Sequence, residues 1–266
     1  MPSDLPTQQT QSPPPPRSST DITSQAIDSI KSAYFNGRQT RQIVDLILPL
    51  IGSTEIDDWP GGLRQQFKAA VPLVERILKH LKQQPGLEGP LKPEIIDDAD
   101  AVGAWSGDSL VLILFPNPET LMNQVKKLCE STTNPNRLVL LVNPQWSTQG
   151  QIVSDFGIFP WQKKAAEDFL STFSPGYSVQ NTRINGDYCQ WLYTNPTGWQ
   201  VFVLTGPGAK ENTCIIPAQP ERPSYKEVES TLRSLPWTMS SKSLAERIVA
   251  EADFIKRTAQ APPPSE

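Results

Sequence analysis

The chain has 266 residues and a formal net charge of −4, so it lacks the excess of basic side chains with which proteins bind a nucleic-acid backbone. No apolar run approaches the roughly 20 residues that a membrane-spanning helix needs. Three widely spaced cysteines and a single histidine, His80, argue against a disulfide framework and a structural zinc site. We therefore expect a soluble protein without a bound metal or cofactor.

The two ends of the chain differ in composition from its middle. Residues 1–19 are mainly Pro, Ser, Thr and Gln, and residues 261–266 are also rich in Pro. Such segments bury too little apolar surface to offset the entropy of ordering, so we expect two disordered tails. The first tail has neither the apolar core of a secretory signal nor the arginine content of a transit peptide. Alternatively, it is the start of a mature chain from which a targeting segment has already been removed. Residues 20–260 are expected to form a single domain.

Two helices and one strand are predicted in the first third of the chain. Apolar residues recur at helical spacing between Thr20, a candidate N-cap, and the stop signal Asn36-Gly37. Residues 41–51 have the composition of a strand. An apolar stripe from residue 63 to 81 predicts a second helix, which Pro72 should kink or split.

The middle third alternates between connections, strands and helices. Residues 84–108 are rich in Pro, Gly and Asp and predict a long connection. Continuous apolar runs at 110–115 and 137–142 predict strands that are buried on both faces. Asn117-Pro118 supplies an N-cap and an N1 proline for the helix that follows the first run. Residues 159–173 predict a further helix.

The pattern changes in the last third. Residues 177–184, 188–194 and 199–205 predict three strands, joined by turns at Asn185-Gly186 and at residues 195–198. Consecutive strands with such short connections form an antiparallel meander.

Two helices are predicted after the meander, at residues 224–235 and 243–260. The second begins with a Ser243/Glu246 capping box. It carries an apolar stripe wide enough to pack into the core: Leu244, Ile248, Ala252 and Ile255. We predict an α/β fold: one mixed sheet of parallel β-α units, followed by an antiparallel meander at one edge and flanked by helices.

Three loops are expected at the carboxyl ends of the parallel strands, where open α/β sheets bind their ligands. They cover residues 57–62, 115–118 and 143–146. The candidate ligand-binding or partner-binding side chains on them are Asp57, Asp58, Trp59, Asn117, Asn143, Gln145 and Trp146. The alternative interpretation is structural: Asp58 and Asn117 cap helices, and the two indoles pack over the ends of the sheet.

Three other polar patterns fall short of a recognisable site. Residues 206–211 resemble a phosphate-binding loop but lack its GxxxxGK[ST] spacing, which favours a simple turn. The aspartates between residues 97 and 108 could bind a hard cation, but they lack the EF-hand spacing, which favours a solvated acidic loop. His80 lies near a predicted helix end, where a solvated helix-terminal role is expected. No catalytic residue is predicted.

Several segments resemble a domain of unknown function found in plants, algae and cyanobacteria. The resemblance covers about residues 22 to 235, and its most specific block is Asp57-Asp58-Trp59-Pro60-Gly61-Gly62 with the helix start up to Ala70. It also includes residues 26–37, 48–52, 112–116 and 141–146. Members include chloroplast proteins needed for photosystem II accumulation, and the domain also follows a plastid adenylate kinase. The resemblance implies a stromal auxiliary protein that helps to assemble a thylakoid complex, and it supplies no catalytic residues.

Three functions are compatible with these observations. The first is a non-catalytic assembly or interaction factor whose loops and tails contact a partner protein, since loop tryptophans are frequent at protein interfaces. The second is a small-molecule or nucleotide-binding enzyme that uses Asp57 and Asp58. The third is peripheral membrane association through the C-terminal helix, although acidic residues offset its basic Lys256-Arg257 end. The sequence does not specify the partner or the oligomeric state.

Overall fold

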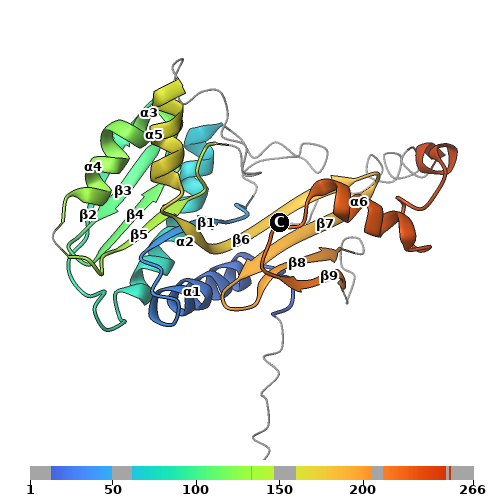
Figure 1. Ribbon diagram of the computed structural model, residues 1–266, viewed down its shortest axis with the longest axis horizontal. Helices are drawn as coiled ribbons and strands as arrows, with labels where there is room; N and C mark the ends of the chain where they lie inside the picture. The colour runs from blue at the N-terminus through green and yellow to red at the C-terminus, as the bar shows by residue number, and fades with distance from the viewer. Residues whose placement is uncertain are drawn as a thin grey trace, which may run out of the picture.

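The computed structural model of the protein describes residues 13–49, 62–132, 134–146, 160–204, 212–249 and 252 (Figure 1). The strands in this part of the chain are β1 Arg41–Asp45, β2 Lys92–Asp97, β3 Val102–Ser106, β4 Leu110–Leu114, β5 Leu138–Val142, β6 Ser174–Ile184, β7 Asp187–Thr194, β8 Gly198–Val203 and β9 Thr213–Gln219. The helices are α1 Ser19–Phe35, α2 Leu63–Leu81, α3 Pro118–Thr120, α4 Lys126–Glu130, α5 Pro160–Leu170 and α6 Tyr225–Ser234. A π-helical turn, Leu121–Val125, joins α3 to α4, and residues 244–249 are helical.

The strands form one mixed sheet in the order β2-β3-β4-β5-β1-β6-β7-β8-β9. The four central strands β4, β5, β1 and β6 run parallel. From β6 to β9 each strand is antiparallel to its neighbour, which confirms the predicted meander and adds one strand to it. Asn185 and Gly186 both have positive φ angles, 49° and 98°, as a two-residue hairpin turn requires. The predicted α/β class with a mixed sheet is confirmed.

A second antiparallel pair, β2 and β3, lies on the other flank of the sheet and pairs with β4. The prediction of a long connection over residues 84–108 is therefore wrong, and antiparallel strands flank both sides of the parallel centre. The signal is weak because β2 is an edge strand in which no side chain is fully buried. Its Pro93 is tolerated there, since an edge strand leaves one row of N–H groups without a partner strand.

Helices cover both faces of the sheet, and side-chain alternation along the strands separates the two layers. Leu110, Leu112 and Leu114 of β4 pack with α1 and α2, whereas Val111 and Ile113 pack with α4 and α5 on the opposite face. A third cluster joins α6 to β7 and β8. Figure 1 shows α3, α4 and α5 beside β2–β5, and α6 beside the meander. The strands β4 and β5 are buried on both faces, as their apolar runs predict.

The first elements differ from the prediction in three details. The N-cap of α1 is Ser18, whose side chain accepts from Asp21 N, and not Thr20. Strand β1 ends at Asp45 and not at residue 51, because the backbone of Leu46 bonds to a side chain, that of Asn143, and not to a neighbouring strand. Pro72 does not split α2, since it lies on the exposed side of the helix, where water can hydrate the carbonyl group that loses its donor.

The C-terminal helix begins where predicted, but its apolar side does not pack as predicted. Ser243 N donates to Glu246 Oε2 at 2.9 Å and Glu246 N donates to Ser243 Oγ at 3.4 Å, which confirms the capping box. The prediction that its apolar stripe packs into the core is wrong, because Leu244 and Ile248 are 66% and 60% exposed. The spacing of apolar residues identifies an apolar stripe on a helix, but it does not identify the surface against which the stripe packs.

A pair of glycine substitutions separates backbone strain from steric overlap. Gly86 and Gly198 both have a positive φ, but an added Cβ meets open space at Gly86 and lies 2.5 Å from Gln219 O at Gly198. We expect Gly86→Ala to lower the free energy of unfolding by about 1–2 kcal/mol and Gly198→Ala by about 2–5 kcal/mol, because overlap with β9 adds to the strain. Urea unfolding of both variants measures this, and equal losses would contradict the proposed overlap.

Candidate functional site

The parallel strands end at one edge of the sheet, which we call the carboxyl edge. After β1 the next helix, α2, packs on one face, whereas the helix after β5, α5, packs on the other face. Strands β1 and β5 are neighbours, so their connections diverge at this point. Such a divergence leaves a crevice at the carboxyl edge, where open α/β sheets bind ligands.

Two of the predicted site residues meet at the turn between β2 and β3. Asn117 Nδ2 donates to Asp100 Oδ2 at 2.6 Å, and Gln145 Nε2 donates to Asp100 O at 3.3 Å. Asn117 Oδ1 also accepts from Thr120 N at 2.7 Å, so this side chain is the N-cap of α3. The polar atoms of these side chains therefore hold the turn in place.

The remaining predicted residues divide between the core, the crevice and the part of the chain outside the described residues. Trp146 is 9% exposed and packs in the cluster of α4 and α5. Asn143 lies at the crevice. Asp57, Asp58 and Trp59 lie outside the described residues. The helix that follows them, α2, has its N-cap at Gly62 and not at Asp58.

Asn143 fixes the way in which the chain leaves β1. Its Oδ1 accepts from Leu46 N at 2.7 Å, and its Nδ2 donates to Leu46 O at 2.8 Å. Asn143 and Phe115, which follow the neighbouring strands β5 and β4, have φ angles of 47° and 56°. Left-handed backbone at non-glycine residues costs free energy and clusters at functional sites. The carboxyl edge is thus strained and tightly held beside the end of β1.

A pocket of about 420 Å³ opens at the end of β1, on the carboxyl edge. We call it the Asp45 pocket. Its polar lining side chains are Asp45, Asn143, Gln180, Asn181, Thr182 and Arg222. Its volume lies within the range of about 300–1,000 Å³ that is typical of small-molecule sites.

Asp45 is the last residue of β1 and is half-buried. Ser178 Oγ and Gln180 Nε2, both on β6, donate to Asp45 Oδ2 at 2.9 and 3.2 Å. Burial raises the pKa of this carboxyl group above its ordinary value, against the opposing effects of the two donors and of the Arg222 charge. Ionisation of Asp45 therefore lowers the free energy of unfolding.

Arg222 supplies the opposite charge from the segment before α6. It donates to Gln180 Oε1 at 2.6 Å, and its guanidinium carbon lies 5.3 Å from the centre of the Trp199 ring. Burial lowers the pKa of the guanidinium group, which the Asp45 charge counteracts. The amide of Gln180 thus lies between Arg222 and Asp45, accepting from one and donating to the other.

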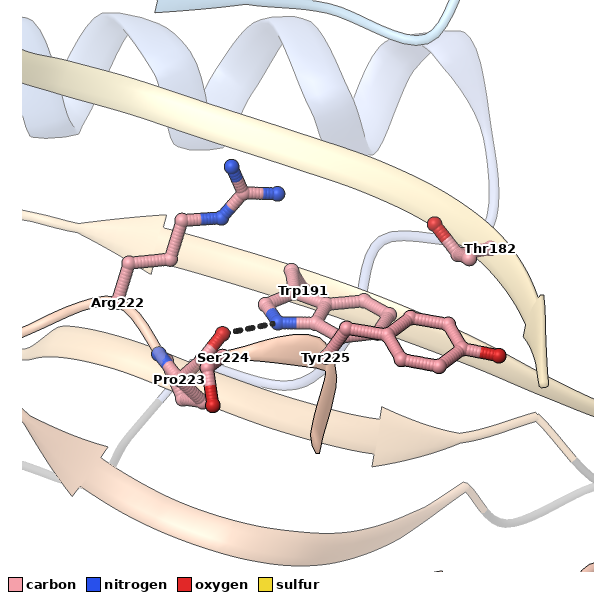
Figure 2. Close-up of a pocket in the computed structure, with 6 residues that line it drawn as sticks. All are labelled: Thr182, Trp191, Arg222, Pro223, Ser224 and Tyr225. Atoms are coloured by element: carbon pink, nitrogen blue, oxygen red, sulfur yellow. Dashed lines mark hydrogen bonds between the residues drawn. The ribbon is translucent and has the colours of Figure 1, made fainter. Parts of the chain in front are cut away.

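An aromatic pocket of about 250 Å³ adjoins the Asp45 pocket and shares Thr182 and Arg222 with it. Figure 2 shows Trp191 and Tyr225 among the side chains that line this pocket, together with Thr182 and Arg222. Trp191 Nε1 donates to Pro223 O at 3.1 Å, which fixes the indole plane. Tyr225 is 45% exposed. The two pockets together offer opposite charges and a flat aromatic surface.

The other titratable groups offer little chemistry. Cys129 and Cys189 are buried, and burial raises the pKa of each thiol to about 12, so both remain protonated at neutral pH. No group of three or more His, Cys, Asp or Glu residues in the described ranges could hold a metal ion. Asp97 Oδ1 accepts from the N–H groups of residues 99 and 100, and Asp98 pairs with Arg64. His80 is exposed in the last turn of α2, as predicted.

Three residues of this site, Asp45, Gln180 and Arg222, are not among those predicted from the sequence. The available signal for Asp45 was a single carboxylate within the apolar run of residues 43–51, and the predicted strand extended past it to residue 51. Gln180 alternates with apolar residues, as any half-exposed strand residue does. Nothing in the local sequence of Arg222 distinguishes it from other surface arginines, because its partners come from β6 and β8.

A family model described as a domain of unknown function, DUF1995, matches residues 16–230. The chain belongs to this family. The DUF1995 match begins just before α1, ends within α6 and includes every side chain of the Asp45 pocket named above. Comparisons with curated proteins and with solved structures gave no match. Membership of a family of unknown function is thus confirmed, while the link to chloroplast proteins stays a prediction.

Substitutions of Asn143 test how much its two hydrogen bonds to the backbone of Leu46 stabilise the fold. Asn143→Gly keeps the left-handed backbone but loses both bonds to Leu46, so we expect the free energy of unfolding to fall by about 1–3 kcal/mol. Asn143→Ala loses the same bonds and adds a backbone cost of about 1–2 kcal/mol. Urea denaturation measures both values. An alanine variant as stable as the glycine variant would show that the backbone at residue 143 is not strained.

Replacement of Asp45 tests the cost of its charge. Because its folded pKa is raised, the unfolded chain releases the Asp45 proton near pH 4 while the folded chain retains it. The free energy of unfolding contributed by this group therefore falls as pH rises from about 4 to the folded pKa. Urea unfolding of Asp45→Asn and of the parent at pH 4 and at pH 7 measures this. We expect the stability of the variant relative to that of the parent to be greater at pH 7 than at pH 4. A relative stability that is lower at pH 7 than at pH 4 would contradict this assignment.

Proposed function

We propose that this protein is a non-catalytic auxiliary factor that assists the assembly of a thylakoid complex, with photosystem II as the foremost candidate. It would act through protein–protein contacts in the chloroplast stroma or on the stromal face of the thylakoid. The resemblance to chloroplast proteins supports the compartment and the complex. None of the helices in the described part of the chain is long and apolar enough to cross a membrane.

The observation that carries the proposal is the exposed apolar side of the helix at residues 244–249. Leu244, Ile248 and Val249 are 66%, 60% and 63% exposed. These residues are mostly exposed, and apolar groups gathered on one exposed element mark protein interaction sites. This helix lies beyond the family match, which ends at residue 230, so the proposed contact surface is an addition to the shared domain.

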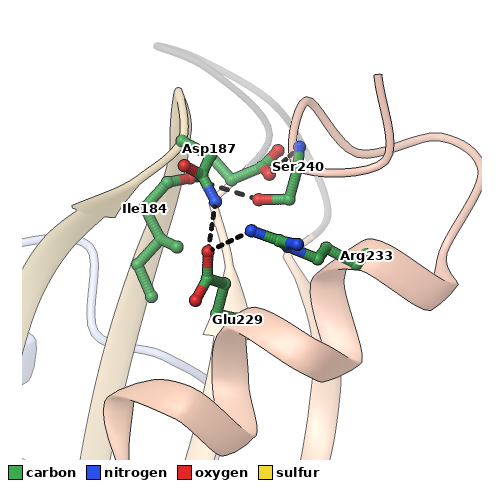
Figure 3. Close-up of polar contacts among 6 residues, drawn as sticks. Ile184, Asp187, Glu229, Arg233 and Ser240 are labelled. Carbon is green, nitrogen blue, oxygen red and sulfur yellow. Dashed lines mark hydrogen bonds and ion pairs between the residues drawn. The ribbon is translucent and has the colours of Figure 1, made fainter. Parts of the chain in front are cut away.

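The fold holds the approach to this helix in a defined place. Asp187, a buried residue at the start of β7, accepts from Met239 N at 2.8 Å and from Ser240 N at 2.7 Å. Figure 3 shows Ser240 seated over the β6–β7 hairpin beside Glu229 and Arg233 of α6. Glu229 Oε1 accepts from Asn185 Nδ2 at 3.0 Å and from Arg233 Nη2 at 2.8 Å. These contacts tie the segment before the helix to the meander and reduce the entropy that docking would cost.

The second candidate function is a small-molecule-binding or nucleotide-binding enzyme. The pocket at the carboxyl edge favours it, because ligands of α/β sheets bind there. The residues proposed for it from the sequence are Asp57 and Asp58, so Asp58→Ala should abolish any stabilisation by nucleotides or Mg²⁺ in a thermal-shift assay.

The docking proposal predicts a charge effect on one side of the C-terminal helix. We expect Ile248→Glu to abolish cross-links between the protein and thylakoid-complex subunits in isolated chloroplasts, because a carboxylate would be buried in the interface. Gln162→Glu adds the same charge at an exposed position of another helix, α5, and should preserve the cross-links. Both variants should unfold within about 0.5 kcal/mol of the parent. Cross-links that survive Ile248→Glu would refute this surface, and an absence of thylakoid subunits from the parent's cross-links would refute the proposed partner.

A further inference from the structure

We propose that the Asp45 pocket binds a neutral, ring-shaped polyol of the monosaccharide class. Asp45, Asn181 and Thr182 would bond to its hydroxyl groups, and Ile47 and Pro144 would contact its C–H groups. This inference concerns the sheet edge and does not depend on the docking role of the C-terminal helix.

The pocket opens where the chain leaves β1 on the side of β5. Both backbone groups of Leu46 bond to the side chain of Asn143, which follows β5. The last residue pair between β1 and β6 is Asp45 with Ser178, although β6 continues to Ile184. In the described part of the chain no strand pairs with this side of β6 beyond that point. Strand β6 therefore has a bare edge beside the end of β1.

The bare edge of β6 forms one wall of the pocket, because four consecutive residues, Val179 to Thr182, line it. Successive side chains of a strand point to opposite faces of the sheet, so a pocket that touches four in a row runs along the edge of the strand. An unpaired edge presents a row of backbone N–H and C=O groups. A row of hydroxyl groups can satisfy both kinds, since each hydroxyl both donates and accepts.

Three side chains of the pocket have hydrogen-bonding groups without a partner among the described residues. Asp45 Oδ2 accepts two hydrogen bonds from side chains of β6, whereas Oδ1 accepts none. Asn181 Oδ1 accepts from Gln190 Nε2 at 2.9 Å, and Asn181 Nδ2 makes no bond of its own. The Thr182 hydroxyl group is the third. Together they supply an acceptor, a donor and a group that does both.

The charges around the pocket favour a neutral ligand. Burial raises the pKa of Asp45 and lowers that of Arg222, and the charge of each residue counteracts the shift of the other. The two charges thus stabilise each other. A ligand with a net charge would add one that this pair does not balance, which costs free energy away from bulk water. Hydroxyl groups bond to a carboxylate and an amide without adding a charge.

The apolar part of the lining suits the ring of a sugar. Leu46, Ile47, Pro144 and Val179 lie beside the polar groups of the pocket. A pyranose has C–H groups on the faces of its ring and hydroxyl groups around its rim, so it matches a pocket that offers both. The volume of about 420 Å³ is in the range of small-molecule sites.

The test uses the full chain and three probes, D-glucose, D-galactose and D-mannose, in isothermal titration calorimetry. At least one should bind with a Kd below about 1 mM. The amino and uronic acid derivatives of that sugar add a positive and a negative charge, and each should bind at least about tenfold more weakly. A blocked tetraalanine peptide is the probe for the competing occupant, an added strand, and should not bind.

Variants assign the contacts to residues. Asp45→Asn replaces a charge-assisted hydrogen bond by a neutral one and should weaken binding about tenfold. Thr182→Val removes a hydroxyl group at nearly constant shape and should weaken binding about three- to tenfold. Thr213→Val makes the same change at an exposed position of β9 and should bind as the parent does. Ile248→Glu should also bind normally, which separates this site from the docking surface.

Four outcomes would overturn the proposal. They are failure of all three sugars to bind the parent, binding of the peptide in their place, binding of either charged derivative as tightly as the neutral sugar, and full binding by both pocket variants. Thr182 is exposed, so its replacement keeps the test decisive if Asp45→Asn does not fold.

Discussion

The burial of the parallel strands β4 and β5 between two helical layers is the constraint from which the rest of this structure follows. Strands β4 and β5 are fully buried, so neither can carry a polar side chain without a partner. Polar groups are therefore displaced to the carboxyl edge, where the chain leaves the sheet. There they meet one another: Asn117 and Gln145 at Asp100, and Asn143 at Leu46.

Asp45 brings a charge to this edge, and its surroundings show what retaining that charge requires. Two donors on β6 and a guanidinium group from the segment before α6 are arranged around one carboxyl group whose pKa burial still raises. A fold selected only for stability would gain from an apolar or amide residue here. Destabilising charges that are kept in a pocket are characteristic of sites that bind or react with something.

This DUF1995 protein has two surfaces that are suited to different kinds of binding. The pocket at the sheet edge lies within the family match, and the apolar side of the helix at residues 244–249 lies beyond it. The first is polar, concave and oriented by hydrogen bonds, as small-ligand sites are. The second is apolar and convex, as helices that dock into a partner's groove are. One chain can carry both, because Asp187 and α6 fix the second surface without using the residues of the first.

The sequence by itself determined the elements whose signals are local: the buried strands β4 and β5, the meander with its Asn185-Gly186 turn, the Asn117 cap and the Ser243/Glu246 capping box. Those signals suffice because periodicity, turn chemistry and capping act over a few residues. Only the tertiary structure decided the pairing of the edge strands β2 and β3, the exposure of Leu244 and Ile248, and the site itself. Asp45, Gln180 and Arg222 are 42 residues or more apart in the chain, and burial and charge pairing depend on distances in space that local sequence does not encode.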